Sequence, residues 1–150
     1  MAHLAPLKLP PAPLKLTKQG ELIWVNCLIR KKSILLTPEE WVRQHLISYL
    51  HLYKGFSLAK ISVEKQIQYA GFTKRWDIVV YDAAFQPFLL IECKAPEINL
   101  SEAVFRQIAV YQQKIRAPFL ALSNGLAHKI YEVNLEKQQL NELADFPENC

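Results

Sequence analysis

The segment WDIVVYDAAFQPFLLIECK, residues 76–94, decides the fold of this chain. It contains two runs rich in β-branched, aromatic and other apolar residues, at 76–82 and 87–93, and a short turn-like stretch separates them. Runs of this composition are typical of strands, and the short gap between them predicts an antiparallel β-hairpin.

The length of the connecting loop fixes the register of this hairpin. If residues 83–86 form the loop, residue i pairs with residue 169 − i. Directly opposite residues share a face of the sheet, with Cβ atoms about 4.5–5.5 Å apart. Lys94 lies two residues beyond Glu92 and is therefore predicted on the same face. The predicted pairs are Tyr81 with Phe88, Val79 with Leu90, and Asp77 with Glu92.

This register brings three ionisable side chains, Asp77, Glu92 and Lys94, to one end of an otherwise apolar strand pair. Two carboxylates placed side by side repel, and a cation relieves the repulsion. Lys94 alone can neutralise one charge, but Mg²⁺ or Mn²⁺ also prefers carboxylate oxygens. A bound metal lowers the pKa of a coordinated water, and a lysine can orient that water or stabilise an anionic transition state. The pattern therefore indicates hydrolysis of a phosphodiester.

A simpler interpretation makes Glu92 and Lys94 a surface ion pair at a strand end and Asp77 a turn residue. An Asp and an E-x-K recur by chance in many sequences. The apolar residues that flank the charged triplet and the matched register favour a functional site, because a solvated face would be more polar.

The sequence before the hairpin predicts an arm, two strands and a helix. Residues 1–20, rich in proline, are expected to form a mobile arm, and residues 21–150 a single domain. Residues 21–36 hold two short apolar runs that indicate a β-hairpin or two edge strands, and residues 58–72 predict one or two more. Thr37 and Pro38 are typical of a helix start, and the helix is expected to end near Leu52.

The sequence after the hairpin predicts alternating helices and strands. A second helix is expected from Asn99 or Ser101 to about Arg116. Strands are expected at 118–122 and 127–134, and a short helix at 136–146. The order of elements predicts an α/β domain with a central mixed β-sheet flanked by helices.

Composition sets broad limits on the function. The chain has 150 residues, a net charge of +4 and three cysteines with no close pair. No disulfide framework or zinc knuckle follows, and no apolar run approaches the roughly 18 residues that span a bilayer. We expect a cytoplasmic protein with no membrane association. The positive charge is compatible with a polyanionic partner.

Several motifs in order resemble the PD-(D/E)xK nuclease superfamily, and within it the N-terminal nuclease domain of type I restriction enzyme R subunits. The motifs are LTPEEWVRQHL (36–46), KRWDIVVYD (74–82), PFLLIECKAP (87–96), VFRQIAVYQ (104–112) and LSNG (122–125). Trp76 replaces the proline of the superfamily name. The resemblance implies a restriction-endonuclease-like core and Mg²⁺-dependent cleavage of DNA.

The resemblance also implies further site residues. Glu40 is the candidate for a glutamate on the first helix, although it also completes a capping box with Thr37, and Glu39 is the alternative. Gln107 and Tyr111 form a Q-x-x-x-Y pair on one helix face, which is similar to RecB-like nucleases; Tyr111 is otherwise a core residue and Gln107 its polar rim. The backbone carbonyl of Cys93 is a candidate metal ligand.

Basic residues near these motifs are candidates for DNA-backbone contacts. Each of them is also explained by a solvated face, and Arg75 by an ion pair with a carboxylate. The candidates are Arg43, Lys65, Lys74 and Arg75.

No G-x-x-x-x-G-K-[S/T] phosphate loop is present, so no motor is expected, and no sequence-reading module is recognisable. We expect weak sequence specificity, with a protein partner that supplies targeting or a motor. Cleavage of two strands makes a homodimer plausible. Two alternatives stay open: a non-catalytic nucleic-acid-binding or interaction module that keeps the nuclease fold, and an RNA or structured-junction substrate.

Overall fold

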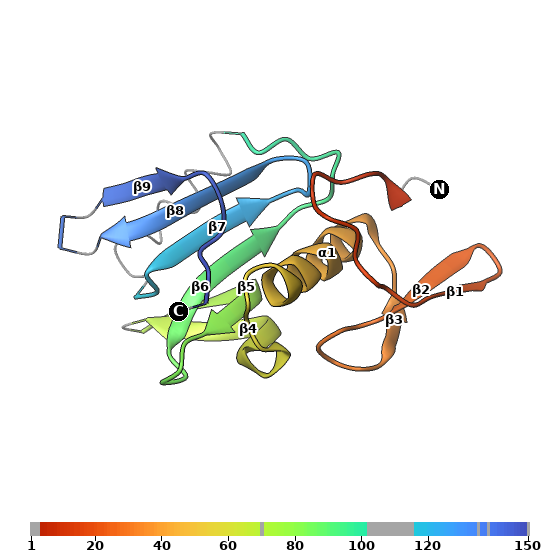
Figure 1. Ribbon diagram of the computed structural model, residues 1–150, viewed down its shortest axis with the longest axis horizontal. Helices are drawn as coiled ribbons and strands as arrows, with labels where there is room; N and C mark the ends of the chain where they lie inside the picture. Colours follow the sequence, from red (N-terminus) through yellow and green to blue (C-terminus); the bar gives the residue numbers. More distant parts are fainter. Residues whose placement is uncertain (1–3, 70, 102–115, 135, 138, 150) are drawn as a thin grey trace.

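The computed structural model describes residues 4–69, 71–101, 116–134, 136–137 and 139–149. A six-stranded mixed sheet in the order β4-β5-β6-β7-β8-β9 forms the body, with β6 and β7 parallel and the other neighbours antiparallel. Helix α1 lies against one face of this sheet, and a small three-stranded sheet, β1-β2-β3, projects beside it (Figure 1). The elements are β1 (Leu16–Gln19), β2 (Leu22–Asn26), β3 (Ser33–Leu35), α1 (Pro38–Leu52), the 3₁₀ helix η2 (Leu58–Lys60), β4 (Ile61–Tyr69), β5 (Phe72–Tyr81), β6 (Pro87–Cys93), β7 (Phe119–Ser123), β8 (His128–Asn134) and β9 (Gln139–Leu143). The predicted central mixed sheet is therefore confirmed.

Helix α1 begins where the sequence predicted. The Thr37 hydroxyl accepts a hydrogen bond from the backbone N–H of Glu40 at 3.0 Å, and Pro38 occupies the first helical position. The first N–H groups of a helix have no partner within the helix. The Thr37 hydroxyl supplies a partner for one of them, and Pro38 has no N–H that needs one. Val42 and Leu46 on this helix are fully buried against the sheet.

The two faces of the six-stranded sheet bury different clusters. Ile78, Val80 and Ile91 pack with α1 on one face. Trp76, Val79 and Leu90 pack together on the other face, with Leu120 and Leu122 of β7. The cluster to which a strand residue belongs shows which face of the sheet its side chain points to. These directions define the geometry of the candidate site.

The predicted hairpin register holds in the middle of the β5–β6 pair. Ile78, Val79 and Val80 lie opposite Ile91, Leu90 and Leu89, as the loop length required. The register shifts between Val80 and Tyr81, so Tyr81 lies opposite Pro87 and the predicted pair with Phe88 is wrong. The extra residue in β6 forms a bulge next to the loop, where bulges commonly end a ladder.

The C-terminal prediction of a helix at 136–146 is wrong, because residues 139–143 form strand β9. Leu140 and Leu143 of this strand lie opposite Val133 and Ile130 of β8. The segment is short and polar, which left its period ambiguous. The unpaired backbone edge of β8 decides the outcome, since it offers hydrogen bonds to any neighbouring segment.

The N-terminal arm is more ordered than its composition predicted. Strand β1 pairs with β2 throughout its length. Ahead of it, the backbone N–H of Lys8 donates to the carbonyl of Gly125 at 2.8 Å, and the Trp41 indole N–H donates to the carbonyl of Ala5 at 2.9 Å. Leu7 and Leu9 pack against the main core. Apolar side chains between the prolines therefore attach the described part of the arm to the domain.

The expected second helix, with Gln107 and Tyr111, falls mostly on residues 102–115, which lie outside the described residues. Within the part of the chain that is described, no helix is both long and apolar enough to cross a membrane.

Candidate functional site

Asp77 lies where β5 separates from β6. The last pair between these strands is Ile78 with Ile91. One residue further, the Asp77 carboxylate accepts a hydrogen bond from the backbone N–H of Cys93 at 2.7 Å. The side chain of Asp77 thus satisfies a strand amide that the ladder no longer reaches.

In both β4 and β5, the regular alternation of side chains between the two faces of the sheet breaks at the position of Asp77. Glu64 on β4 occupies the opposite position and has a φ of 51°, in the left-handed region. The pairs on either side, Val63 with Ile78 and Lys65 with Trp76, keep the same register. Ile78 nevertheless faces α1, whereas Trp76 faces the other side of the sheet. A regular strand would place residues two apart on one face, so the alternation breaks here.

This break overturns the predicted arrangement of Asp77 and Glu92. Asp77 contacts Arg43 of α1 on one side of the sheet. Glu92 alternates with Ile91 and Cys93, which face α1, and so points to the opposite side with Leu90. The two carboxylates lie at the same end of the β5–β6 pairing, as predicted, but they do not share a face.

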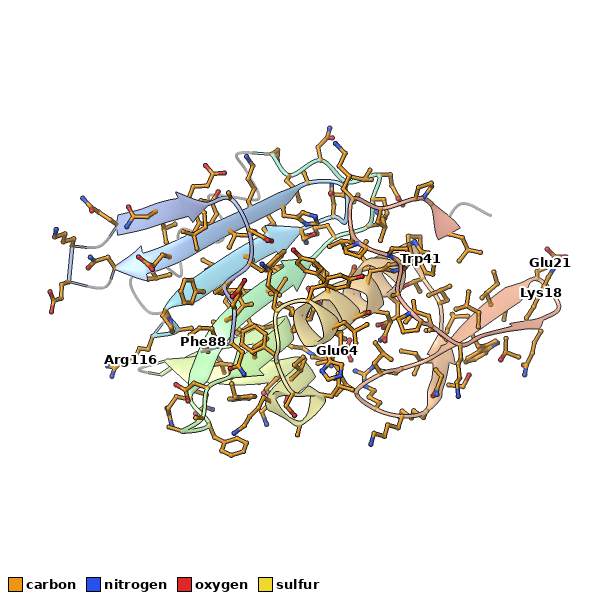
Figure 2. The ribbon with its side chains drawn as sticks, viewed as in Figure 1. Lys18, Glu21, Trp41, Glu64, Phe88 and Arg116 are labelled. Atoms are coloured by element: carbon orange, nitrogen blue, oxygen red, sulfur yellow. The ribbon has the colours of Figure 1, made fainter. Side chains whose placement is uncertain are left out.

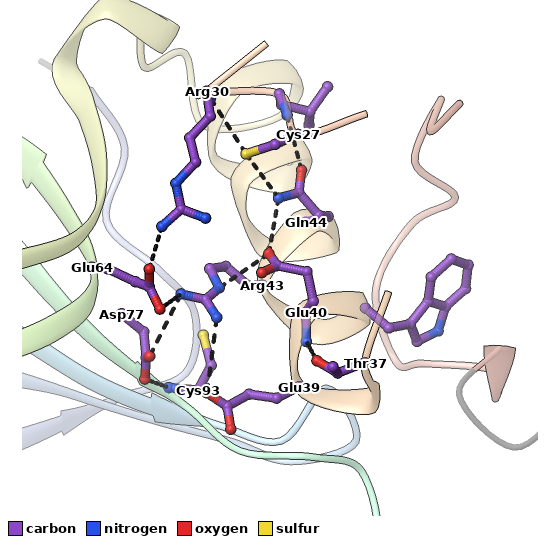
Figure 3. A network of polar contacts seen from close by, with 12 residues as sticks. Cys27, Arg30, Thr37, Glu39, Glu40, Arg43, Gln44, Glu64, Asp77 and Cys93 are labelled. Carbon is purple, nitrogen blue, oxygen red and sulfur yellow. Dashed lines mark hydrogen bonds and ion pairs between the residues drawn. The ribbon is translucent and has the colours of Figure 1, made fainter. Parts of the chain in front are cut away.

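Around Arg43, acidic side chains gather from three elements (Figure 3). The Arg43 guanidinium lies 3.1 Å from Glu40 and 3.9 Å from Glu39 on its own helix. It also lies 3.7 Å from Asp77 on β5 and 3.6 Å from Glu64 on β4. Only 7% of the Arg43 side chain and 8% of the Glu40 side chain are exposed. Arg43 is therefore the buried counter-ion of the whole group.

The charges in this group shift one another's protonation. Burial is the largest influence on Glu39 and raises its pKa, and the Asp77 carboxylate raises it further. Arg43 and Lys94 lower the pKa of Glu39 but by less, so it lies above its usual value. Burial lowers the pKa of Arg43, but Glu40 and the other acidic neighbours outweigh it, so the pKa is raised and the guanidinium stays charged. Burial raises the pKa of Glu64, but the hydrogen bond from Arg30 and the charge of Arg43 outweigh burial. The pKa of Glu64 therefore lies below its usual value.

Glu40 belongs to this site rather than to a reciprocal capping box. Its carboxylate accepts a hydrogen bond from the Gln44 amide at 3.0 Å and faces Arg43. The same Gln44 amide donates to the sulfur of Cys27 at 3.3 Å, which links the site to the loop after β2. Of the two candidate glutamates, Glu40 is buried and Glu39 is partly exposed.

On the other face of the sheet, Glu92 forms an ion pair with Lys74. The ammonium lies 3.1 Å from one carboxylate oxygen, and the two side chains are 12% and 15% exposed. Lys74 also lies over the ring of Trp76, 4.8 Å from its centroid. Lys74 and Trp76 share a face because they are two residues apart on the regular part of β5.

Lys94 and Cys93 follow Glu92 at the end of β6. The backbone N–H of Lys94 donates to the carbonyl of Ser123 on β7 at 2.8 Å. The Lys94 charge acts on Glu39, so its side chain is within electrostatic reach of the Arg43 group. Cys93 is 1% exposed, and burial, followed by Asp77, raises the pKa of its thiol well above the usual value. The Cys93 thiol is thus a neutral core group.

Two residues of this site escaped the sequence reasoning, Glu64 and Arg30. They form an ion pair with each other, and Arg75, which is 62% exposed, lies 3.5 Å from Glu64. A glutamate inside an alternating strand was the available signal, since its charge opposes the apolar pattern around it. Arg43 and Lys74, which were predicted as DNA contacts, form internal ion pairs in the structure.

The carboxylates in this region carry the oxygen donors that Mg²⁺ and Mn²⁺ prefer, but their arrangement does not fit a shared cation. Asp77 and Glu92 face opposite sides of the sheet; Asp77 shares Arg43 with three further carboxylates, and Glu92 pairs with Lys74. Among the described residues, no group of three or more His, Cys, Asp and Glu side chains could hold a metal ion.

Comparison with known proteins identifies one family. The family model described as type I restriction enzyme R protein N terminus matches residues 38–147, which include α1 and the six-stranded sheet. A search of the curated proteins found no match.

Proposed function

Because the chain belongs to the family of the type I restriction enzyme R protein N terminus, we propose that it is a nuclease that hydrolyses phosphodiester bonds in DNA. The observation that carries the proposal is the position of Asp77, Glu92 and Lys94 within the matched residues, where the pairing of β5 with β6 ends. Carboxylates and a lysine are the side chains that phosphodiester hydrolysis uses.

The proposal includes Mg²⁺ or Mn²⁺ as cofactor, with Asp77, Glu92 and the Cys93 carbonyl as the candidate donors. In the described geometry Arg43 and Lys74 neutralise the two carboxylates. Cation binding therefore requires both carboxylates to exchange their present partners.

Lys94 has a role that does not depend on the ion. It follows Glu92 at the open end of β6, and its charge reaches the carboxylates beside α1. A positive charge at this place stabilises the negative charge that develops on a phosphate during hydrolysis. Glu40, Gln107 and Tyr111 are proposed as supporting residues through the family alone.

The test is nicking of supercoiled plasmid by purified protein in the presence of Mn²⁺. Asp77→Ala and Lys94→Ala are expected to lower the nicking rate roughly hundredfold or more, because the first removes a candidate metal donor and the second removes the positive charge that stabilises the phosphate. Lys129→Ala is the matched control, since Lys129 is a half-exposed surface lysine paired with Glu142 far along the sheet. Nicking that survives both Asp77→Ala and Lys94→Ala would reject the assignment.

A non-catalytic nucleic-acid-binding module is the second candidate, and one observation favours it. Both acidic residues of the motif already contact a basic side chain of the same chain, Asp77 with Arg43 and Glu92 with Lys74. Calorimetry with Mn²⁺ separates the two candidates. Heat of binding that disappears in Asp77→Ala supports the nuclease, whereas DNA binding without metal binding supports the module.

A further inference from the structure

The positive charge of the chain is concentrated in its first quarter. Residues 1–37 contain six of the 18 Lys and Arg but one of the 14 Asp and Glu, so they carry a net charge of +5. The remaining residues carry −1, which gives the total of +4. This basic segment forms the small β1-β2-β3 sheet with its loops and precedes the residues matched by the family model.

Three lysines of this segment lie at one end of the small sheet. Lys31 and Lys32 lie in the loop between β2 and β3, and Lys15 immediately precedes β1. The backbone N–H of Asn26 donates to the carbonyl of Lys15 at 3.0 Å, which places Lys15 beside the start of that loop. All three side chains are exposed, and none of them pairs with a carboxylate among the described residues. We name Lys15, Lys31 and Lys32 the basic edge.

The loop that carries the basic edge is held in a fixed shape. Backbone hydrogen bonds of 2.9 Å join Cys27 to Lys32 and Lys31 to Cys27. Lys31 has a φ of 54°, which belongs to this tight turn. The loop is therefore a rigid support rather than a free tether.

The same loop is attached to the candidate site. The backbone N–H of Leu28 donates to the Gln44 side chain at 3.1 Å, and Gln44 also bonds Glu40. Arg30, next to Lys31, pairs with Glu64 of the Arg43 group (Figure 3). These contacts fix the basic edge directly beside the carboxylates and α1.

The opposite end of the small sheet carries charges of both signs. Lys18 and Glu21 lie together at the tip of the β1–β2 hairpin, away from α1 (Figure 2). Glu21 offsets positive charge at the tip, whereas no acidic residue lies between Asn26 and Pro38. The unopposed charge is thus at the end that faces the site.

We propose that the basic edge binds the phosphate backbone of DNA held at the candidate site. The choice of DNA rests on the proposed function. Arg43 and Lys74 cannot supply these contacts while they neutralise Asp77 and Glu92, but the three lysines of the edge are exposed. Ammonium groups on phosphates give affinity without reading base sequence, and each contact releases counterions.

The experiment measures binding of a short fluorescein-labelled duplex by fluorescence anisotropy, in EDTA so that no cleavage occurs. The wild type is compared with Lys31→Gln/Lys32→Gln and with the control Lys129→Gln/Lys137→Gln, which removes the same charge from the β8–β9 region. Titrations between about 50 and 200 mM salt give the slope of log K against log salt. We expect the edge variant to lose roughly 1.8 from this slope and at least about tenfold in affinity at low salt.

The control should keep the wild-type slope and affinity. Equal losses in both variants, or no loss in the edge variant, would overturn the proposal. No salt-dependent binding by the wild type would also overturn it. Plasmid nicking is read separately: wild type that binds through the edge but does not cleave leaves this proposal standing while the proposed catalysis fails.

Discussion

Removal of Arg43 is the most direct test of the buried charge group. In Arg43→Met the apolar stem is kept and the guanidinium is lost, so Glu40, with a side chain 8% exposed, remains buried without its counter-ion. Removing one partner of a buried pair costs about 3–5 kcal/mol. The free energy of unfolding of a domain of this size falls by about 2 kcal/mol per M urea, so this loss should lower the urea midpoint of unfolding by about 2 M.

Arg75→Met is the matched control. Arg75 also contacts a carboxylate, Glu64, at 3.5 Å, but its side chain is 62% exposed. An exposed ion pair of this kind contributes about 0–1 kcal/mol, because water screens it. The control midpoint should therefore stay within about 0.5 M of the wild type at the same urea dependence.

Urea unfolding followed by circular dichroism measures both midpoints. The double variant Arg43→Met/Glu40→Gln should recover part of the loss, since no unpaired charge then stays buried at that contact. Equal midpoint shifts in Arg43→Met and Arg75→Met would refute the reasoning, because they would mean that Arg43 is as well solvated as Arg75.

Gly125→Ala should destabilise the protein by about 1–3 kcal/mol, because Gly125 has a φ of +83° and an added Cβ would lie 2.7 Å from Leu7. Gly20→Ala is the control, because Gly20 has a similar φ of +62° and an added Cβ there would meet nothing within 4 Å. Thermal unfolding should show a larger loss of stability for Gly125→Ala than for Gly20→Ala. Equal losses of stability would contradict the attachment of the arm at the Gly125 turn. Burial raises the pKa of Asp145, but the Lys54 hydrogen bond and its other partners bring it below the usual value. Its stabilising effect is therefore present above its unfolded pKa, near about 3.9, and is lost as the pH falls below it. The difference in unfolding free energy between wild type and Asp145→Asn should shrink between about pH 6 and pH 3, and a difference that grows toward acid pH would contradict this sign.

The sequence predicted local structure well where short-range chemistry decides it. Thr37 and Pro38 started α1 as expected, because capping depends on residues within one turn. The middle of the β5–β6 hairpin kept its predicted register, since the loop length sets it. The C-terminal helix failed for the opposite reason: residues 139–143 have no strong period, and the open edge of β8 recruits them into the sheet.

The sequence also found most members of the candidate site, but it paired them incorrectly. Asp77, Glu92 and Lys94 do lie where the pairing of β5 with β6 ends, and Glu40 of α1 shares Arg43 with Asp77. The rule that opposite residues share a face needs two regular strands. Glu64, with its left-handed φ, breaks β4 opposite Asp77 and reverses the faces on one side of that point.

The sequence by itself determined the start of α1, the pairing of β5 with β6 and most of the charged residues of the candidate site, because caps and loop length act over short distances. Only the tertiary structure decided the partners of those charges. Asp77 lies with Arg43 on the α1 face and Glu92 with Lys74 on the other. These partners depend on the break in the neighbouring strand β4 at Glu64, opposite Asp77, and on the burial of Arg43 between α1 and the sheet. The contact of Arg43 with Asp77 joins residues far apart in the chain, and residue spacing does not record it.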